Sequence, residues 1–217
     1  VIESLKEMEM PLREIKEFIS VTTPDTMIEL FKEKSKQISE KINNLASIQN
    51  TIEKKILITE EAIKTDFSEI VLTEAEEEYL YLSALLLNND DDENKAAISD
   101  FYKVCMSELH EKYSIGVMMK IEDVADGQFE NFAHLFAKTD YTDALPLEKN
   151  DKTMQVIGYH TGQYENVEKT YNAMFNFIEK NHLHPVDYLY TEPILDRISV
   201  NDSDKYVTKI TIPVTRG

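Results

Sequence analysis

Apolar residues recur at helical spacing through the first nineteen positions of the chain. Residues three or four apart lie on one face of an α-helix, and the apolar members here are Ile2, Leu5, Met8, Leu12, Ile15, Phe18 and Ile19. Pro11 interrupts the pattern and favours the first turn of a new helix. We therefore expect two short helices joined at Pro11, a segment that by itself is typical of a peripheral helical hairpin.

A heptad pattern follows, from residue 23 to residue 65. Thr23 is a favourable N-cap, Pro24 suits the first helical position, and Asp25 complements the positive end of the helix dipole. Steps of four and three residues then meet mostly apolar side chains: Phe31, Ile38, Ile42, Leu45, Ile52 and Ile56. A lone helix with so narrow an apolar seam needs a partner, so we expect a homodimer through residues 23–65. The alternative is that the seam packs on its own domain.

The remaining chain, residues 66–217, repeats one order of elements. The first copy comprises a strand at 77–87, a helix at 96–113 and strands at 115–121 and 129–138. The second comprises a strand at 153–162, a helix at 164–181 and strands at 186–192 and 205–214. The predicted fold class is α+β: a helical segment over 1–22, a long coiled-coil helix, and a duplicated strand-helix-strand-strand domain with a central cleft.

Composition narrows the set of partners. The 217 residues include 41 acidic and 23 basic side chains, a formal net charge of −18, so most of the surface repels nucleic acid and anionic membranes. No apolar run is long enough to cross a bilayer, and the single cysteine, Cys105, cannot form an intramolecular disulfide. We expect a cytoplasmic protein that binds neither a membrane nor, through these residues, DNA.

The acidic run at 88–94, NNDDDEN, lacks the ligand spacing and the central glycine of a calcium-binding loop. We expect it to be a loop that caps the next helix. His182 and His184 have no partner at metal-ligand spacing and are expected at the surface. The sequence thus predicts no metal site and no cofactor.

The second half ends with a characteristic pattern. A strand leads into a His-x-Gly-x-Tyr turn at His160, Gly162 and Tyr164; the next helix has spaced aromatic and apolar residues, and the last strand ends in Ile-Pro-Val. Across residues 70–217 this pattern resembles the GyrI-like small-molecule-binding domain, with Phe177 where a tryptophan is common. The resemblance implies that the cleft binds a small effector.

Residues 2–16 are similar to the segment that follows the wing in MerR-family regulators, with Pro11 inserted before Leu12. Together the two resemblances, in this order, imply a multidrug-responsive MerR-type transcription regulator. Its winged helix-turn-helix would precede Val1, and residues 1–22 would be the remnant of that DNA-binding domain. Promoter DNA would then be contacted only through the helix-turn-helix missing from this chain.

The resemblance also implies a class of ligand and a set of ligand-binding residues. Relatives that take lipophilic cations use a buried carboxylate among aromatic rings, and a cation offsets the desolvation of such a carboxylate. An ungapped match places Asp187 at that acid, whereas a shift of one residue brings Tyr188 and Tyr190 into the matching places. Alternate strand residues face opposite sides, so Asp187 and Tyr190 cannot both face the cleft without a bulge; we favour Asp187. The other expected ligand-binding residues are Tyr171, Glu192, Tyr159, Tyr79, Tyr81, Phe175 and Met118.

Two alternative functions are compatible with the same features. Some GyrI-like proteins are implicated in hydrolysis of electrophilic amides or dyes, but Cys105 lies mid-helix among apolar residues, as a packing thiol does. No nucleophile elbow, phosphate loop or dinucleotide motif is present, so we predict no catalytic residue. The other alternative is a dimeric adaptor that binds a protein through its acidic face.

Overall fold

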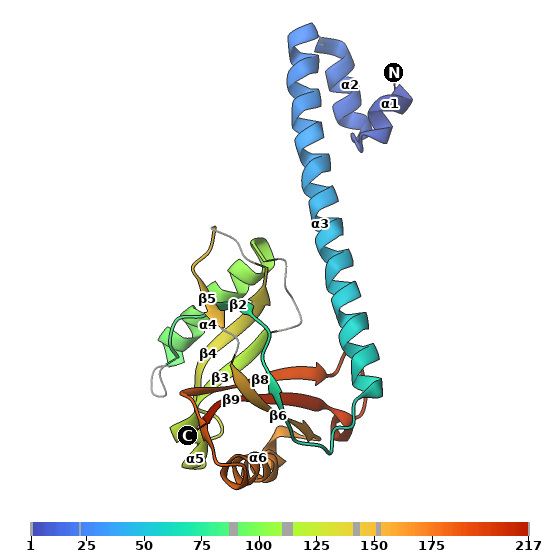
Figure 1. Ribbon diagram of the computed structural model, residues 1–217. Helices are drawn as coiled ribbons and strands as arrows, with labels where there is room; N and C mark the ends of the chain where they lie inside the picture. The colour runs from blue at the N-terminus through green and yellow to red at the C-terminus, as the bar shows by residue number, and fades with distance from the viewer. Residues whose placement is uncertain are drawn as a thin grey trace. The chain divides into compact units, whose positions relative to one another are not determined.

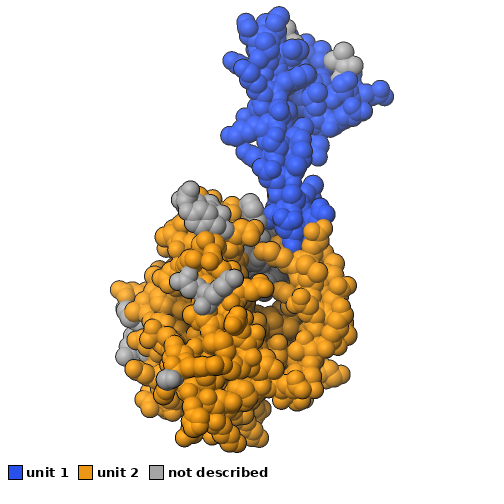
Figure 2. Space-filling model, viewed as in Figure 1, with its two compact units in different colours: residues 1–50 blue, residues 51–217 orange. Residues whose placement is uncertain are grey.

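The computed structural model describes residues 2–21, 23–86, 91–109, 115–140, 144–150 and 153–216. The chain divides into two compact units, Val1–Asn50 and Thr51–Gly217 (Figure 2). The division falls inside helix α3 (Pro24–Lys64), whose ends match the predicted coiled-coil helix.

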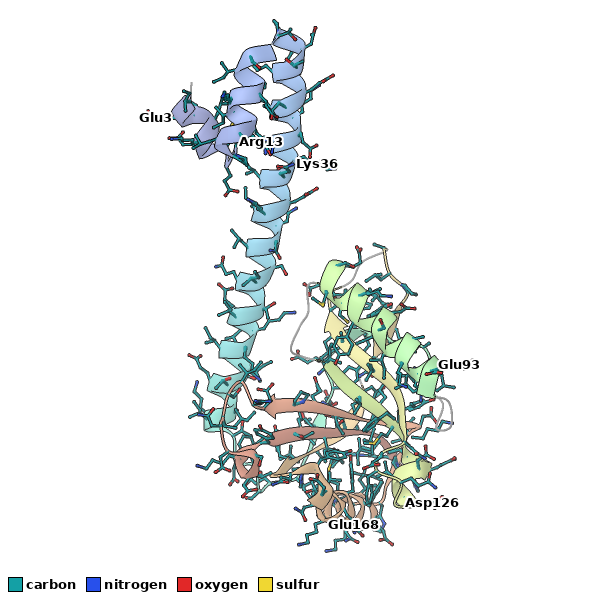
Figure 3. All side chains as sticks on the ribbon, turned by 180° about the vertical axis from the view of Figure 1, so that it is seen from behind. Glu3, Arg13, Lys36, Glu93, Asp126 and Glu168 are labelled. Carbon is teal, nitrogen blue, oxygen red and sulfur yellow. The ribbon has the colours of Figure 1, made fainter. Side chains whose placement is uncertain are left out.

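The first unit consists of α1 (Ile2–Glu7), α2 (Leu12–Val21) and the beginning of α3. The predicted pair of short helices joined at Pro11 is confirmed. Its small core is formed by the buried side chains of Leu5, Met10 and Ile15, against which Met8, Phe18 and Leu30 pack. Polar side chains such as Arg13 and Lys36 extend away from the helices (Figure 3).

Helix α3 begins with a reciprocal cap. The Thr26 amide donates to Thr23 Oγ1 at 3.2 Å, and the Thr23 amide donates to Thr26 Oγ1 at 2.8 Å. Two amides that the helix cannot satisfy internally are thereby bonded. The N-cap expected at Thr23 is confirmed.

The second unit is built on an antiparallel sheet, in which the described residues form nine strands (Figure 1). The strands are β1 (Val71–Glu74), β2 (Glu78–Leu82), β3 (Ile115–Lys120), β4 (Phe132–Thr139), β5 (Leu147–Asn150), β6 (Met154–Thr161), β7 (Leu183–Pro185), β8 (Tyr188–Leu195) and β9 (Val207–Arg216). Their order is β1-β6-β9-β8-β3-β4-β2-β5, and β7 pairs with β9. The pairing of β3 with β8 joins the two halves of the predicted duplication into one sheet.

Helices cover one face of this sheet. Helix α4 (Asp91–Ser107) packs Phe101 and Cys105 on the first half, and α6 (Glu168–Lys180) packs Met174 and Ile178 on the second. Both helices lie on the same face. Val117 of β3 packs against the core residues of α4, and its cross-strand partner Thr191 lies on the face of β8 that α6 covers. Cross-strand partners share a face of the sheet. The opposite face is therefore left for the candidate site.

The acidic surface lies away from the sheet. Glu93 on α4, Asp126 after the short helix α5 (Ile121–Ala125) and Glu168 on α6 point outward (Figure 3). Charged side chains placed in this way are solvated and need no buried partner. Among the described residues, no helix has the length and apolar character needed to span a membrane.

Several predicted boundaries were wrong. Helix α4 begins at Asp91, inside the expected acidic loop, since acidic side chains stabilise the first turn of a helix; residues 88–90 and 110–113 lie outside the described residues. Strand β2 ends at Leu82 instead of 87. The sequence also did not predict β1, β5 or β7, which are three or four residues long and show no complete alternation.

The close approach of β3 to β8 gives a test of the fold. A Cβ atom added at Gly116 would lie 2.6 Å from the Thr191 carbonyl oxygen and would also overlap the buried Phe136 ring. We predict that Gly116→Ala lowers the free energy of unfolding by about 1–3 kcal/mol, because backbone paired in a sheet cannot move aside. Urea denaturation measures this free energy. Gly127→Asn is the control, because Gly127 has open space around it and asparagine tolerates its φ of +78° better than most residues do. Wild-type stability of Gly116→Ala would contradict the packing of β3 on β8.

Candidate functional site

A cleft of about 360 Å³ lies between the open face of the sheet and the end of α3. Figure 2 shows the second unit hollowed on the side in view. The cleft is lined by Lys54, Leu57, Ile58, Glu61, Ala62, Thr65, Phe67, Lys138, Tyr159, Glu192, Ile194 and Lys209. Through Lys138, Glu192 and Lys209 it continues into a narrower hollow that also includes Glu78, Leu80, Phe136, Tyr190 and Thr211.

Strand β8 presents two of the predicted residues to this cleft. Leu189 and Thr191 are buried on the helix-covered face, so Tyr190 and Glu192 lie on the open face. The Tyr190 ring meets Phe136 edge-on, with ring centroids 5.5 Å apart. The strand thus holds a tyrosine and a carboxylate side by side in the cleft.

A lysine between two carboxylates occupies the floor of the cleft. Lys138 Nζ lies 3.0 Å from Glu192 Oε2 and 3.1 Å from Glu78 Oε1. Burial acts to lower the pKa of Lys138, but the charges and hydrogen bonds of Glu192 and Glu78 outweigh burial and raise the pKa above its usual value. The Lys138 ammonium therefore remains charged near neutral pH. We call Lys138, Glu192 and Glu78 together the ionic centre.

Two further polar groups beside the ionic centre have no partner among the described residues. Lys209 lies directly across from Glu192 in the β8–β9 pair but forms no ion pair. Thr211 Oγ1 is buried without a hydrogen-bond partner. A buried hydroxyl without a partner costs free energy, so both groups are available to a ligand or to water.

An aromatic and apolar wall faces the ionic centre. Tyr159 on β6 packs on Phe67, with ring centroids 5.1 Å apart, and Leu57 and Ile58 of α3 line the same cleft. Burial, and then the negative charge of Glu61, raise the pKa of Tyr159. Its hydroxyl is therefore neutral near pH 7 and can act only through hydrogen bonds and ring contacts.

The end of α3 is tied to the chain that leaves β8. Lys55 Nζ lies 3.1 Å from Asp196 Oδ2 and donates to the Ile194 carbonyl at 3.4 Å. Burial acts to raise the pKa of Asp196, but the hydrogen bond and charge of Lys55, with amide bonds from Ile198 and Ser199, bring it below its usual value. One wall of the cleft is thus linked to the strand that contains Glu192.

Asp187, the favoured acid, lies outside this cleft. It precedes β8 in a left-handed conformation (φ 39°), its side chain is exposed, and it lines a separate surface hollow with Lys120, Glu122 and Tyr188. The strand therefore begins one residue after Asp187, and strand alternation does not apply to it. Glu192 is the predicted site residue that supplies the carboxylate of the cleft.

The other expected residues are divided between the cleft and the core. Tyr159, Tyr190 and Glu192 line the cleft or its continuation, whereas Tyr79, Tyr81, Tyr171, Phe175 and Met118 do not. Tyr81 stacks on Phe101 under α4, and Tyr79 alternates to the same face of β2. Tyr171 and Phe175 belong to the α6 core, and Met118 is buried beneath the cleft with Leu80 and Phe136.

The side chains of His160 and Cys105 have structural roles. Both ring nitrogens of His160 form hydrogen bonds, Nδ1 with Thr170 Oγ1 at 3.0 Å and Nε2 with the Gln163 carbonyl at 2.9 Å, so His160 holds the turn before α6. Cys105 lies on α4 and is fully buried. Within the described ranges, no group of three or more His, Cys, Asp or Glu residues is placed to hold a metal ion.

Sequence reasoning missed Lys138, Lys209 and Thr211, together with the α3 wall of the cleft. One signal in the sequence could have indicated Lys138: it is a charged residue at the end of an otherwise mostly apolar strand pattern, FAHLFAK. Burying a lone ammonium is costly, so such a residue requires a partner at the same depth. That partner could not be identified from local pattern alone.

The Lys55–Asp196 pair predicts a pH dependence of stability. A carboxyl whose pKa is lowered on folding stabilises the protein above its unfolded pKa, near 4, and this contribution is lost as the pH falls through the folded pKa. We expect Asp196→Asn to lower the free energy of unfolding by about 1 kcal/mol at pH 6 and by less near pH 3, where the carboxyl begins to be protonated. Denaturant titrations across that range, with Lys55→Gln and the double variant, would isolate the pair. An equal loss at both pH values would contradict this assignment.

No model of a known protein family matches the chain. Over 216 residues, covering 99% of this chain and 78% of the relative, it is 34% identical to the multidrug-efflux transporter 2 regulator of Bacillus subtilis (strain 168). Its fold is similar to that of EcmrR in a cryo-EM structure of the EcmrR–DNA complex, with a TM-score of 0.51 and 15% identity over 100% of this chain and 81% of that one. The crystal structure of the EcmrR C-terminal domain gives a TM-score of 0.52 and 15% identity over 69% of this chain and 98% of that domain. The chain therefore belongs to the MerR family of multidrug-responsive transcription regulators, and its second unit has the GyrI-like fold.

Proposed function

We propose that these residues form the ligand-sensing and dimerising portion of the regulator, and that the effector is a small lipophilic molecule bound in the cleft. The observation that supports this most directly is the combination of an aromatic and apolar wall with a partly buried carboxylate, in a cavity whose 360 Å³ suits a small organic ligand. Catalysis is not part of the proposal.

A lipophilic cation is the proposed class of effector. Tyr159 and Phe67 offer ring faces, which attract cations, and Glu192 offers a carboxylate whose side chain is only 16% exposed. A carboxylate desolvated to this extent interacts strongly with a positive charge that enters the same cavity. In this proposal Glu192, and not Asp187, is the carboxylate that binds the cation.

Calorimetric titration tests this site. We expect tetraphenylphosphonium to bind, and Glu192→Gln to weaken binding about tenfold or more, because one charge-assisted contact is lost. Asp187→Asn is the matched control and should bind as the wild type does. The chain has no tryptophan, so calorimetry is preferable to intrinsic fluorescence.

Two results would contradict the proposed site. Binding that is lost in Asp187→Asn but kept in Glu192→Gln would place the effector in the surface hollow. Absence of binding to tetraphenylphosphonium would remove lipophilic cations of this shape as the effector class.

Dimerisation through α3 is the second part of the proposal. The exposed fractions of the seam residues Phe31, Ile38, Ile42, Leu45, Ile52 and Ile56 range from 36% to 64%. Ile198, 61% exposed, lines a shallow apolar hollow with Ile52 and Ile56. A row of exposed apolar side chains at heptad spacing is what a partner helix covers in a coiled coil.

The net charge of −18 disfavours DNA binding by these residues. We therefore propose that a helix-turn-helix outside them contacts DNA.

We predict that Ile42→Lys converts the dimer to a monomer, because a charge in the seam would be desolvated without a partner. Analytical ultracentrifugation over a range of protein concentrations measures the change. Asn43→Lys adds the same charge at the neighbouring exposed position and should leave the dimer intact. If both variants sediment like the wild type, the seam is not the dimer interface.

A further inference from the structure

The ionic centre links the two halves of the sensing unit. Lys138 comes from β4 and Glu78 from β2, both in the first half, whereas Glu192 comes from β8 in the second. The Lys138 ammonium lies within 3.1 Å of an oxygen of each carboxylate. The carboxylate of the cleft thus already has a cation bound to it.

This arrangement restricts how a second cation can bind. Lys209 lies across the strand pair from Glu192, so two lysines, Lys138 and Lys209, accompany this carboxylate, and Glu76 and Glu78 are the other acidic residues of the hollow. An added cation near Glu192 would be repelled by the Lys138 ammonium as long as that group stays in place. Favourable binding therefore requires that the ammonium withdraws from Glu192.

Lys138 is able to withdraw without losing its own stabilisation. Its flexible four-carbon stem allows the ammonium to move, its side chain is 34% exposed toward the cleft, and Glu78 in its own half is already a second partner. Withdrawal toward Glu78 would keep one ion pair and release Glu192. The alternative partner makes an exchange physically accessible.

We propose that Lys138 is the resident cation of the cleft and determines its specificity: a cationic effector binds by replacing the Lys138 ammonium at Glu192. This inference rests on the proposed cation-binding function and adds a competitor built into the chain. The exchange also breaks the ionic link between β4 and β8. Since β8 leads to Asp196, which is paired with Lys55 of α3, the effector alters the contacts of the strand that joins the cleft to the helix.

Calorimetry with tetraphenylphosphonium on charge variants tests the exchange. Lys138→Gln removes the competitor and should tighten binding about tenfold. Lys138→Arg keeps a cation at this position, and its planar guanidinium holds carboxylates with two donors. This variant should therefore bind tetraphenylphosphonium more weakly than the wild type. Because it preserves the ion pairs, it also tests the exchange if Lys138→Gln folds poorly. Lys149→Gln is the matched control, because Lys149 pairs with Glu77 at 2.9 Å outside the cleft, and its affinity should equal that of the wild type.

The outcomes separate this inference from the function on which it rests. If the wild type binds the cation and Glu192→Gln does not, but Lys138→Gln binds no more tightly than the wild type, the exchange is overturned and the cation site stands. An equal gain in Lys149→Gln would also overturn it, because general electrostatics would then explain the effect. If the oppositely charged isostere tetraphenylborate binds instead, and Lys209→Gln abolishes that binding, both the exchange and the cation class fail.

Discussion

The pairing of β3 with β8 is the contact on which the rest of the sensing unit depends. It brings Val117 opposite Thr191 and Met118 opposite Tyr190, and so fixes which side chains of both halves share a face. Gly116 permits the approach, since any side chain there would meet the Thr191 carbonyl. With α4 and α6 on one face, the other face can hold polar groups at the junction of the halves. A shift of one residue in this register would exchange the core and the cleft.

The polar groups of the cleft follow from the cost of burying charge. Glu192 is mostly removed from water, and the nearby ammonium of Lys138 offsets the loss of its hydration. Lys138 in turn remains charged at this depth because two carboxylates act on it. The same contacts that stabilise the cleft thus set the conditions under which a charged ligand can enter. Stability and specificity depend on one group of side chains.

The helices of residues 2–64 could be predicted well from the sequence. Thr23, Pro24 and the heptad seam gave α3 almost to the residue, because caps and helical periodicity are local properties. Long strands such as β6 and β9 were likewise predicted from β-type composition and periodicity. Short strands at or near the sheet edge, such as β1 and β5, depend on a partner distant in sequence and show too few residues for a pattern.

The site was harder to predict because a strand's face changes with each residue. Tyr190, Glu192 and Tyr159 were identified and lie at the cleft or its continuation, but Tyr79 and Tyr81 fall on the opposite face of β2. The preference for Asp187 assumed that the strand already included it, whereas its left-handed backbone lies before the first strand residue. Lys138 acquires its role only from Glu78 and Glu192, contacts that exist once the two halves have paired.

The most direct test is a crystal structure of the protein with tetraphenylphosphonium, in which the position of the phosphorus and the distance from Lys138 Nζ to Glu192 Oε2 are measured. Our account predicts that the cation lies between Glu192 and Tyr159, and that the distance, 3.0 Å in the present structure, exceeds that of an ion pair while Lys138 stays with Glu78. A cation bound beside Asp187, or an unchanged contact between Lys138 and Glu192 with the cation in the cleft, would contradict it.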